Sequence, residues 1–167
     1  MEFKEFVDKI EKHSLSRDLF DRVTEMELRG ICLEKIADYI SGKEIEFENK
    51  LGWICISLVN AAFPGGELRR PDKLNKVYKS MDIVTLTQAM MYGNYLQAMK
   101  VAQYLASVRG KQIEEIFELA YENLENKNGH VIKGRYLSLD EMTYDQRRVV
   151  SNRESKDRYV RKNVKGA

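Results

Sequence analysis

The placement of proline is the feature that most constrains the fold of this chain. Its two prolines, Pro64 and Pro71, lie close together, so no proline interrupts the long stretches on either side of them. In those stretches apolar residues recur at a spacing of three and four, which is typical of amphipathic helices. The sequence therefore predicts an all-α protein, a bundle of about five to six helices.

Capping residues and glycines indicate where these helices begin and end. We expect helices over about 2–12, from Ser16 towards Gly42, over about 45–62, from Asp82 or Thr85 to about Val108, and over about 112–126. Gly30 lies inside the second of these helices, where glycine is unfavourable. A short helix is expected over 72–78, and a short extended flap at Val131, Ile132, Tyr136 and Leu137.

Length and composition indicate one compact domain. The chain has 167 residues, 43% hydrophobic and 32% charged, and a domain of this size buries roughly 70% of the surface of its unfolded chain. Its two cysteines and two histidines are too few and too scattered for a zinc site or a disulfide framework. No stretch reaches the ~20 apolar residues of a membrane span, and the N-terminus lacks the apolar core of a signal peptide. We therefore expect a cytoplasmic protein without membrane contact.

Charge divides the chain into a body and a tail. The formal net charge is +2, but residues 145–167 hold eight Lys/Arg against three acids, so this segment carries +5 and residues 1–144 carry −3. We expect a single helical domain over 1–142 and a basic, poorly packed or partly helical tail over 143–167. Arginines of the tail could contact a protein or the phosphates of a nucleic acid. The candidates are Arg147, Arg148, Arg158 and Arg161.

A helix followed by two spaced glycines, within residues 110–137, resembles a known family. The matching residues are Ile113, Glu114, Glu115, Ala120, Tyr121, Leu124, Lys127, Gly129, Gly134 and Tyr136. This segment resembles the C-terminal part of small MazG-like proteins, the all-α nucleoside triphosphate pyrophosphohydrolases common in phages and bacteria. The resemblance implies a MazG-like bundle, a dimer or tetramer, a nucleotide bound between helices, and cleavage of a (d)NTP to a (d)NMP and pyrophosphate with magnesium.

The acidic motifs of that family are not found at the matching positions of this sequence. Family members carry E-E-x-x-E on one helix and E-x-x-D on the next, because magnesium prefers carboxylate oxygens. Here the second motif falls on Asn94 and Gln97, or on Met91 and Asn94, and the first on Asn49, Lys50 and Trp53. Amides bring no negative charge but can hydrogen-bond a base or a sugar. We therefore favour a catalytically degenerate protein that binds or sequesters a nucleotide through Asn49, Trp53, Asn94 and Gln97.

Acids elsewhere leave catalysis open. Glu34 with Asp38, and Glu44 with Glu48, are pairs four residues apart that would share a helix face and could hold a cation. If the chain is an enzyme, these four acids would have to supply a magnesium site for pyrophosphohydrolysis. The alternative interpretation is that they belong to solvated helix faces.

Two further features allow a different class of function. Arg69 and Arg70, beside Gly65 and Gly66, could hold a phosphate or contact a partner, although an ordinary exposed loop has the same composition. The basic tail could dock on a larger assembly. The alternative function is therefore a small helical phage or bacterial adaptor or inhibitor that docks on a protein or nucleic-acid machine through its tail.

Overall fold

The computed structural model describes residues 1–42, 46–63, 68, 82–127, 130–132, 135–137 and 141–150. These residues are mainly helical, which confirms the all-α prediction. The helices are α1 (Phe3–Lys12), α2 (Ser14–Arg22), α3 (Glu25–Ser41), α4 (Phe47–Ala62), α5 (Ile83–Met91), α6 (Tyr95–Ser107) and α7 (Ile113–Glu125). A further helical segment covers 144–150. The expected extended flap is an antiparallel hairpin of β1 (His130–Ile132) and β2 (Arg135–Leu137), in which His130 pairs with Leu137.

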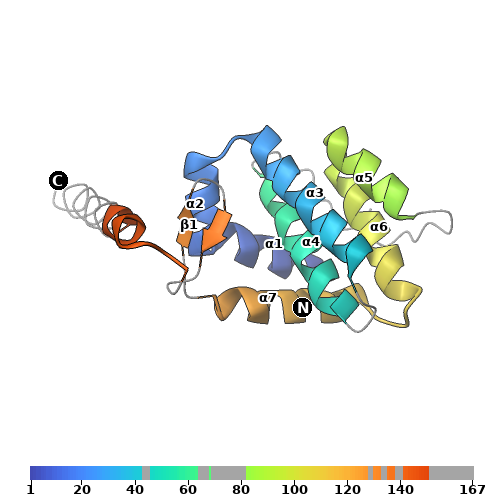
Figure 1. Cartoon of the computed structure of the whole chain (residues 1–167). Coiled ribbons are helices and arrows are strands. Elements are labelled where there is room, and N and C mark those ends of the chain that lie inside the picture. Colours follow the sequence, from blue (N-terminus) through green and yellow to red (C-terminus); the bar gives the residue numbers. More distant parts are fainter. Residues whose placement is uncertain are drawn as a thin grey trace, which may run out of the picture.

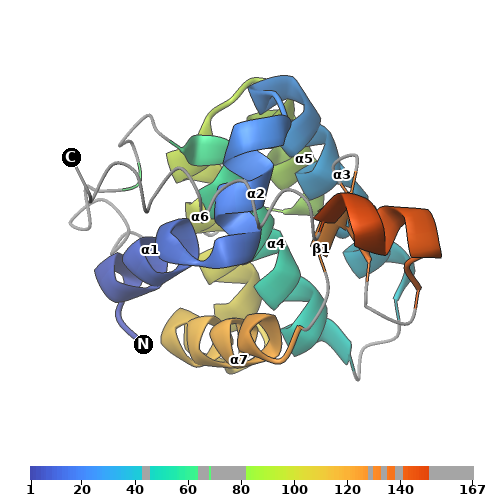
Figure 2. The same cartoon turned by 90° about the vertical axis from the view of Figure 1, so that its left-hand side faces the viewer.

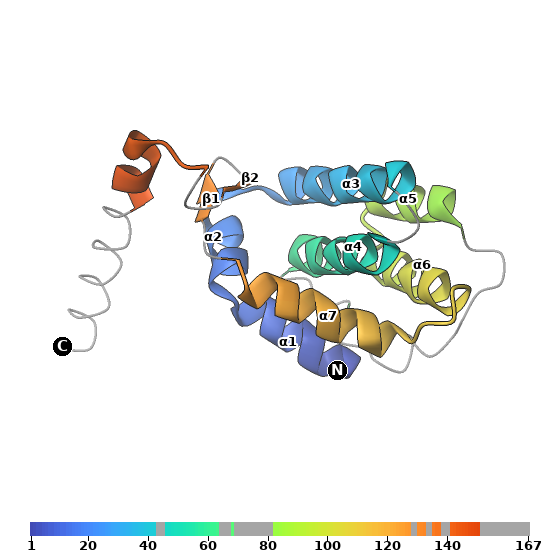
Figure 3. The ribbon, with the colours of Figure 1, turned by 60° about the horizontal axis from the view of Figure 1, so that its bottom comes forward.

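The helices lie in three layers (Figure 3). α3 and α5 form one outer layer, α1 and α7 form the other, and α4 and α6 lie between them. α2 connects the layer of α1 to that of α3, on the side of the bundle that faces the viewer in Figure 2. Helix α4 contacts α1, α2, α3, α6 and α7, so it is the helix around which the others are arranged (Figure 1).

The sequence of α4 explains its central position. From Leu51 to Ala62 the helix is apolar on nearly every face, and a helix that is apolar all round is stable only when it is buried. Gly52 allows a close approach to α7, because a Cβ atom there would lie 3.0 Å from the Cβ of Ala120. In the outer layer of α1 and α7, Phe6 of α1 stacks on Phe117 of α7 with ring centroids 4.2 Å apart.

The helix predicted from Ser16 towards Gly42 is wrong, because the structure has two helices there, α2 and α3. The break lies at Val23 and Thr24 rather than at Gly30, which is inside α3. Thr24 caps α3: its Oγ1 accepts a hydrogen bond from the backbone N–H of Glu27 at 3.2 Å. Helix α2 begins before Ser16, at Ser14, after the N-cap residue His13.

The long helix predicted from Asp82 or Thr85 to Val108 is also wrong, because it is divided into α5 and α6. Asp82 does cap α5, since its Oδ1 accepts a hydrogen bond from the backbone N–H of Thr85 at 3.0 Å. The division occurs at Gly93, which has φ +70°, a left-handed conformation that disfavours every residue with a Cβ. Asn94 then caps α6, its Oδ1 accepting from the backbone N–H of Gln97 at 3.4 Å.

Several predicted features lie outside the described residues. These are Glu44, Arg69, Arg70, Arg158, Arg161 and the helix over 72–78. Of the predicted tail, the described part is helical over 144–150 and lies beyond the hairpin, apart from the three layers (Figures 1 and 3). Within the described ranges, none of the helices has the length and apolar character that crossing a bilayer requires.

Substitution by alanine should change the free energy of unfolding in opposite directions at Gly30 of α3 and at Gly93 between α5 and α6. Gly93→Ala should lower the free energy of unfolding by about 1–2 kcal/mol, the cost of a left-handed L-residue, and its Cβ would lie 2.5 Å from Nη2 of Arg29. Gly30→Ala should raise that free energy by about 0.5–1 kcal/mol, because no atom lies within 4 Å of a Cβ there. Urea unfolding followed by circular dichroism measures both; destabilisation of equal size at the two sites would contradict this account.

Candidate functional site

A cavity of about 280 Å³ lies between α2, α3, α4 and the end of α7, and we call it the α4 cavity. Its walls are largely apolar: α2 supplies Leu15 and Leu19, α3 supplies Leu28 and Ile31, and α4 supplies Ile56. Small-molecule sites in proteins are typically concave, mostly apolar and supplied with a few polar groups. The α4 cavity has both apolar walls and such polar groups, which gather at its two ends.

One end of the α4 cavity is buried and polar. Ser16 of α2 and Ser57 and Asn60 of α4 line it, with relative exposures of 1%, 6% and 5%. Ser57 and Asn60 are three residues apart on α4, so they lie on the same face of that helix. The Oδ1 atom of Asn60 is buried and has no hydrogen-bond partner among the described residues. Hydroxyl and carboxamide groups at this end can hydrogen-bond a ligand that enters the cavity.

The other end is more exposed and carries positive charge around an aromatic ring. Trp53 is half-buried, and the Nζ atoms of Lys35 and Lys127 lie 5.9 Å and 4.9 Å from its ring centroid. At these distances the ring attracts both ammonium groups. Glu34 of α3 also lines the cavity. This end therefore combines an aromatic ring with two cations suited to an anionic group.

A second cavity of about 290 Å³, the outer cavity, shares Lys35 and Trp53 with the first. Asp38, Asn49 and Lys50 complete its lining. The Nζ of Lys50 donates to the backbone carbonyl of Asp38 at 3.1 Å and so holds the end of α3 against α4. The residues around Trp53 thus belong to a continuous surface on α3, α4 and the end of α7.

The predicted nucleotide-binding residues divide between this surface and another place. Asn49 and Trp53 lie together at the outer cavity, and Asn49 Oδ1 accepts a hydrogen bond from Asn123 Nδ2 of α7 at 3.0 Å. Asn94 and Gln97 lie at the start of α6, where Asn94 Nδ2 donates to Gln97 Oε1 at 3.0 Å. Neither lines the α4 cavity or the outer cavity. Their amides cap a helix rather than join the site at Trp53.

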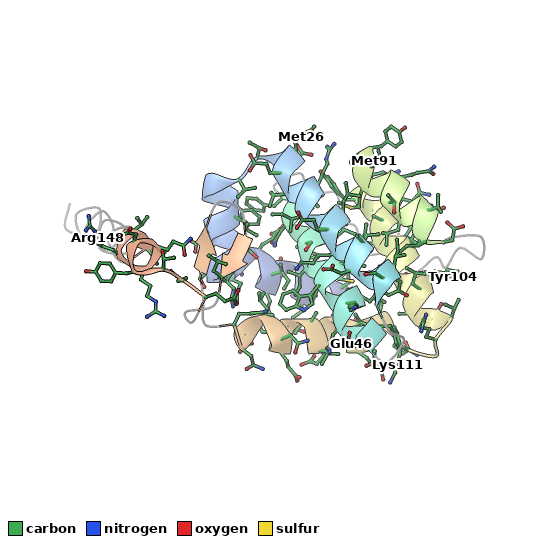
Figure 4. The ribbon with its side chains drawn as sticks, viewed as in Figure 1. Met26, Glu46, Met91, Tyr104, Lys111 and Arg148 are labelled. Atoms are coloured by element: carbon green, nitrogen blue, oxygen red, sulfur yellow. The ribbon has the colours of Figure 1, made fainter. Side chains whose placement is uncertain are left out.

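The candidate catalytic acids are spread over the surface. Glu34 lines the α4 cavity, whereas Asp38 lines the outer cavity. The Oε1 of Glu48 lies 3.5 Å from the Nζ of Lys111, at the foot of the bundle, where Lys111 is labelled in Figure 4. Among the described residues, no three His, Cys, Asp or Glu side chains gather into a group that could hold a metal. These residues do not fit the carboxylate cage that pyrophosphohydrolysis with magnesium needs.

The described tail residues line neither cavity. Arg147 and Arg148 are exposed on the helix over 144–150, and Figure 4 shows Arg148 beyond the hairpin. Thr143 and Gln146 cap this helix reciprocally: Thr143 Oγ1 accepts from the backbone N–H of Gln146 at 3.2 Å, and Gln146 Oε1 accepts from that of Thr143 at 2.9 Å. The start of this helix is therefore fixed by its own sequence.

Sequence reasoning missed Lys35, Ser57 and Asn60 as site residues. Lys35 looks like one of many surface lysines on an amphipathic helix. Ser57 and Asn60, however, stand in an otherwise apolar run, where an asparagine is unusual because a buried carboxamide needs hydrogen-bond partners. Their spacing in the apolar run of α4 was the signal that could have indicated a polar cavity lining.

Comparisons with protein-family models, curated proteins and solved structures found no match for this chain. The likeness of residues 110–137 to MazG-like proteins therefore rests on those residues alone, and the implied dimer or tetramer stays a prediction. In the structure this segment forms α7 and the hairpin. It contributes Leu124 and Lys127 to the α4 cavity.

The free energy of unfolding should fall as pH falls, because His13 caps α2, the helix that forms one wall of the α4 cavity. Its Nδ1 accepts a hydrogen bond from the backbone N–H of Leu15 at 3.2 Å, and burial lowers the pKa of His13 below 6.5, opposed by the charge of Glu125. The unfolded chain thus binds the proton more tightly, so stability is full well above pH 6.5 and declines as pH falls through 6.5 towards the folded pKa.

The measurement is urea unfolding at about pH 7.5 and about pH 5.5, on either side of the usual histidine pKa. His13→Asn is the control, because asparagine also caps helices but does not titrate. The wild type should lose more stability than the variant between the two values. An equal loss would show that His13 is not the titrating cap.

Proposed function

We propose that the α4 cavity binds a nucleotide. The observation that carries this proposal is the exposed end, where the ammonium groups of Lys35 and Lys127 flank the ring of Trp53. A nucleotide joins a flat base to a phosphate, so it matches an aromatic, apolar surface next to cations. The apolar walls from α2, α3 and α4 support the same assignment, since they can cover the faces of a base.

The charges beside Trp53 fit a phosphorylated ligand better than a neutral one. Lys35 and Lys127 contribute two positive charges, and Glu34 contributes one negative charge. Ammonium groups make strong charge-assisted hydrogen bonds to phosphate oxygens. The carboxylate of Glu34 accepts hydrogen bonds only, so it suits a sugar hydroxyl rather than the phosphate.

We propose binding or sequestration rather than hydrolysis. The acids do not share one place: Glu34 lines the α4 cavity, Asp38 lines the outer cavity, and Glu48 forms an ion pair with Lys111. Hydrolysis of a triphosphate by this family needs several carboxylates around the same magnesium ions. The cations, the aromatic ring and the apolar walls of the site, by contrast, are all suited to recognition of a ligand.

Nucleotide binding is tested with Trp53, which is the only tryptophan of the chain. Adding nucleoside mono- or triphosphates should change its fluorescence saturably and raise the melting temperature. Lys35→Gln and Lys127→Gln should each weaken binding by about tenfold or more, because a hydrogen bond to a charged group contributes about 1.5–3 kcal/mol.

Lys9→Gln is the matched control for these two variants. Lys9 also lies over an aromatic ring, 5.0 Å from the centroid of Tyr121, but it lines neither cavity. Its loss should leave nucleotide affinity unchanged. No response of the wild type to any nucleotide would remove the proposal, and pyrophosphate release on adding magnesium would contradict its non-catalytic part.

A second candidate function is that of an adaptor, and the helix over 144–150 favours it. This helix lies apart from the three layers and exposes Tyr144 and Val149, at 79% and 53%, together with Arg147 and Arg148. Exposed aromatic and arginine side chains are enriched where proteins meet partners. We therefore retain docking on a protein or nucleic acid through the tail as the alternative proposal.

Deleting residues 145–167 tests this alternative. The described helices α1–α7 should keep their melting temperature, because their core contains none of the tail residues that the structure describes. If the tail docks on nucleic acid, the full chain should bind DNA or RNA with an affinity that falls steeply with salt, and the shortened chain should not. Equal affinity of the two chains for nucleic acid would contradict a role for the tail in binding it.

A further inference from the structure

Asn60 is a polar residue in the most deeply buried helix of the protein. It is 5% exposed, and its Oδ1 atom is enclosed without a hydrogen-bond partner among the described residues. Buried polar groups in folded proteins are nearly always partnered, so each exception calls for an explanation. An apolar residue at this position would leave no acceptor unsatisfied.

The surroundings of Asn60 indicate a ligand rather than a core contact. Asn60 lines the α4 cavity beside Ser57 of the same helix and Ser16 of α2, both buried. Three buried polar side chains from two helices therefore line a mostly apolar cavity. The Oδ1 atom has almost no accessible surface in the free protein, so a contact with a ligand requires a rotation of the carboxamide, whose terminal torsion is soft.

The two polar ends of the cavity are separated along α4. Trp53 and Asn60 are seven residues apart, which is about 10 Å along a helix axis. Cations lie at the Trp53 end, whereas the buried end offers uncharged acceptors and donors. A ligand that fits both ends has an anionic group at one extremity and an uncharged hydrogen-bonding edge at the other.

We infer that Asn60 recognises the base of the nucleotide, its Oδ1 accepting a hydrogen bond from an exocyclic amino group. This inference rests on the proposed nucleotide binding and adds the class of base: adenine, cytosine or guanine, which carry such an amino group. The phosphate lies at Lys35 and Lys127, and the base edge lies at Asn60, Ser57 and Ser16. A base without the amino group leaves the Asn60 oxygen unpaired, and sites built around such a bond discriminate strongly against that analogue.

The same assignment explains why an unsatisfied residue is kept in α4. In the free protein the Asn60 oxygen has no partner among the described residues and so opposes folding, and in the complex it has a partner. Asn60→Leu should therefore raise the melting temperature of the free protein while it weakens nucleotide binding. If Asn60 were instead hydrogen-bonded within the bundle, its replacement by leucine would lower the melting temperature.

The test compares adenosine 5′-monophosphate with purine riboside 5′-monophosphate, which differ only in the amino group. Wild-type protein should bind the first about tenfold more tightly, the factor that corresponds to one hydrogen bond of about 1.4 kcal/mol. In Asn60→Leu the two affinities should become equal. Asn60→Ala should also equalise them, which keeps the test valid if leucine is too large for the site.

Gln103→Met is the matched control. Gln103 of α6 is the other described residue with a buried, unpartnered carboxamide oxygen, and it lines neither cavity. Its substitution should leave the preference between the two nucleotides unchanged. This separates loss of a ligand contact from a general effect of removing an unsatisfied polar group.

The outcomes distinguish this inference from the proposal beneath it. If wild-type protein binds neither nucleotide, both fail. Suppose instead that wild-type protein binds both nucleotides and that Lys127→Gln weakens the binding of both. If Asn60→Leu then leaves the ratio of the two affinities unchanged, the site is confirmed and the role of Asn60 is refuted. A melting temperature lowered by Asn60→Leu with an unchanged affinity ratio would assign Asn60 to the core instead.

Discussion

The burial of the apolar run of α4 is the constraint on which the rest of the structure depends. An apolar run from Leu51 to Ala62 has to be covered, and α1, α2, α3, α6 and α7 cover it. Any polar side chain in that run then needs a partner inside the bundle. Ser57 and Asn60 are such side chains, and the α4 cavity lies beside them. The packing that stabilises the fold and the position of the candidate site therefore share one origin.

The fold could be predicted where apolar spacing and a clear end signal coincide. This was so for α1, α4 and α7, whose predicted limits lie within about two residues of the observed ones. The prediction failed where the apolar spacing continues through a break between two helices. Val23 keeps the apolar spacing across the end of α2, and Gly30, which looked like the weak point, lies inside α3.

The candidate site could be predicted only in part, for a related physical reason. Asn94 and Gln97 were placed by counting along one continuous helix, but that helix is divided at Gly93, and the two amides bond each other. Trp53 and Asn49 lie four residues apart on an unbroken helix, and these two of the predicted residues do line one cavity. Lys35 and Lys127 come from α3 and from the end of α7, and only tertiary packing brings them to Trp53.

The most direct test of the central claim, that the α4 cavity is a nucleotide site, is a crystal structure with a non-hydrolysable triphosphate and magnesium. The account predicts density inside the cavity, with phosphate oxygens at the ammonium groups of Lys35 and Lys127 and the edge of the base at Asn60. A nucleotide bound elsewhere on the bundle, with the Asn60 oxygen partnered by a neighbouring side chain, would contradict it.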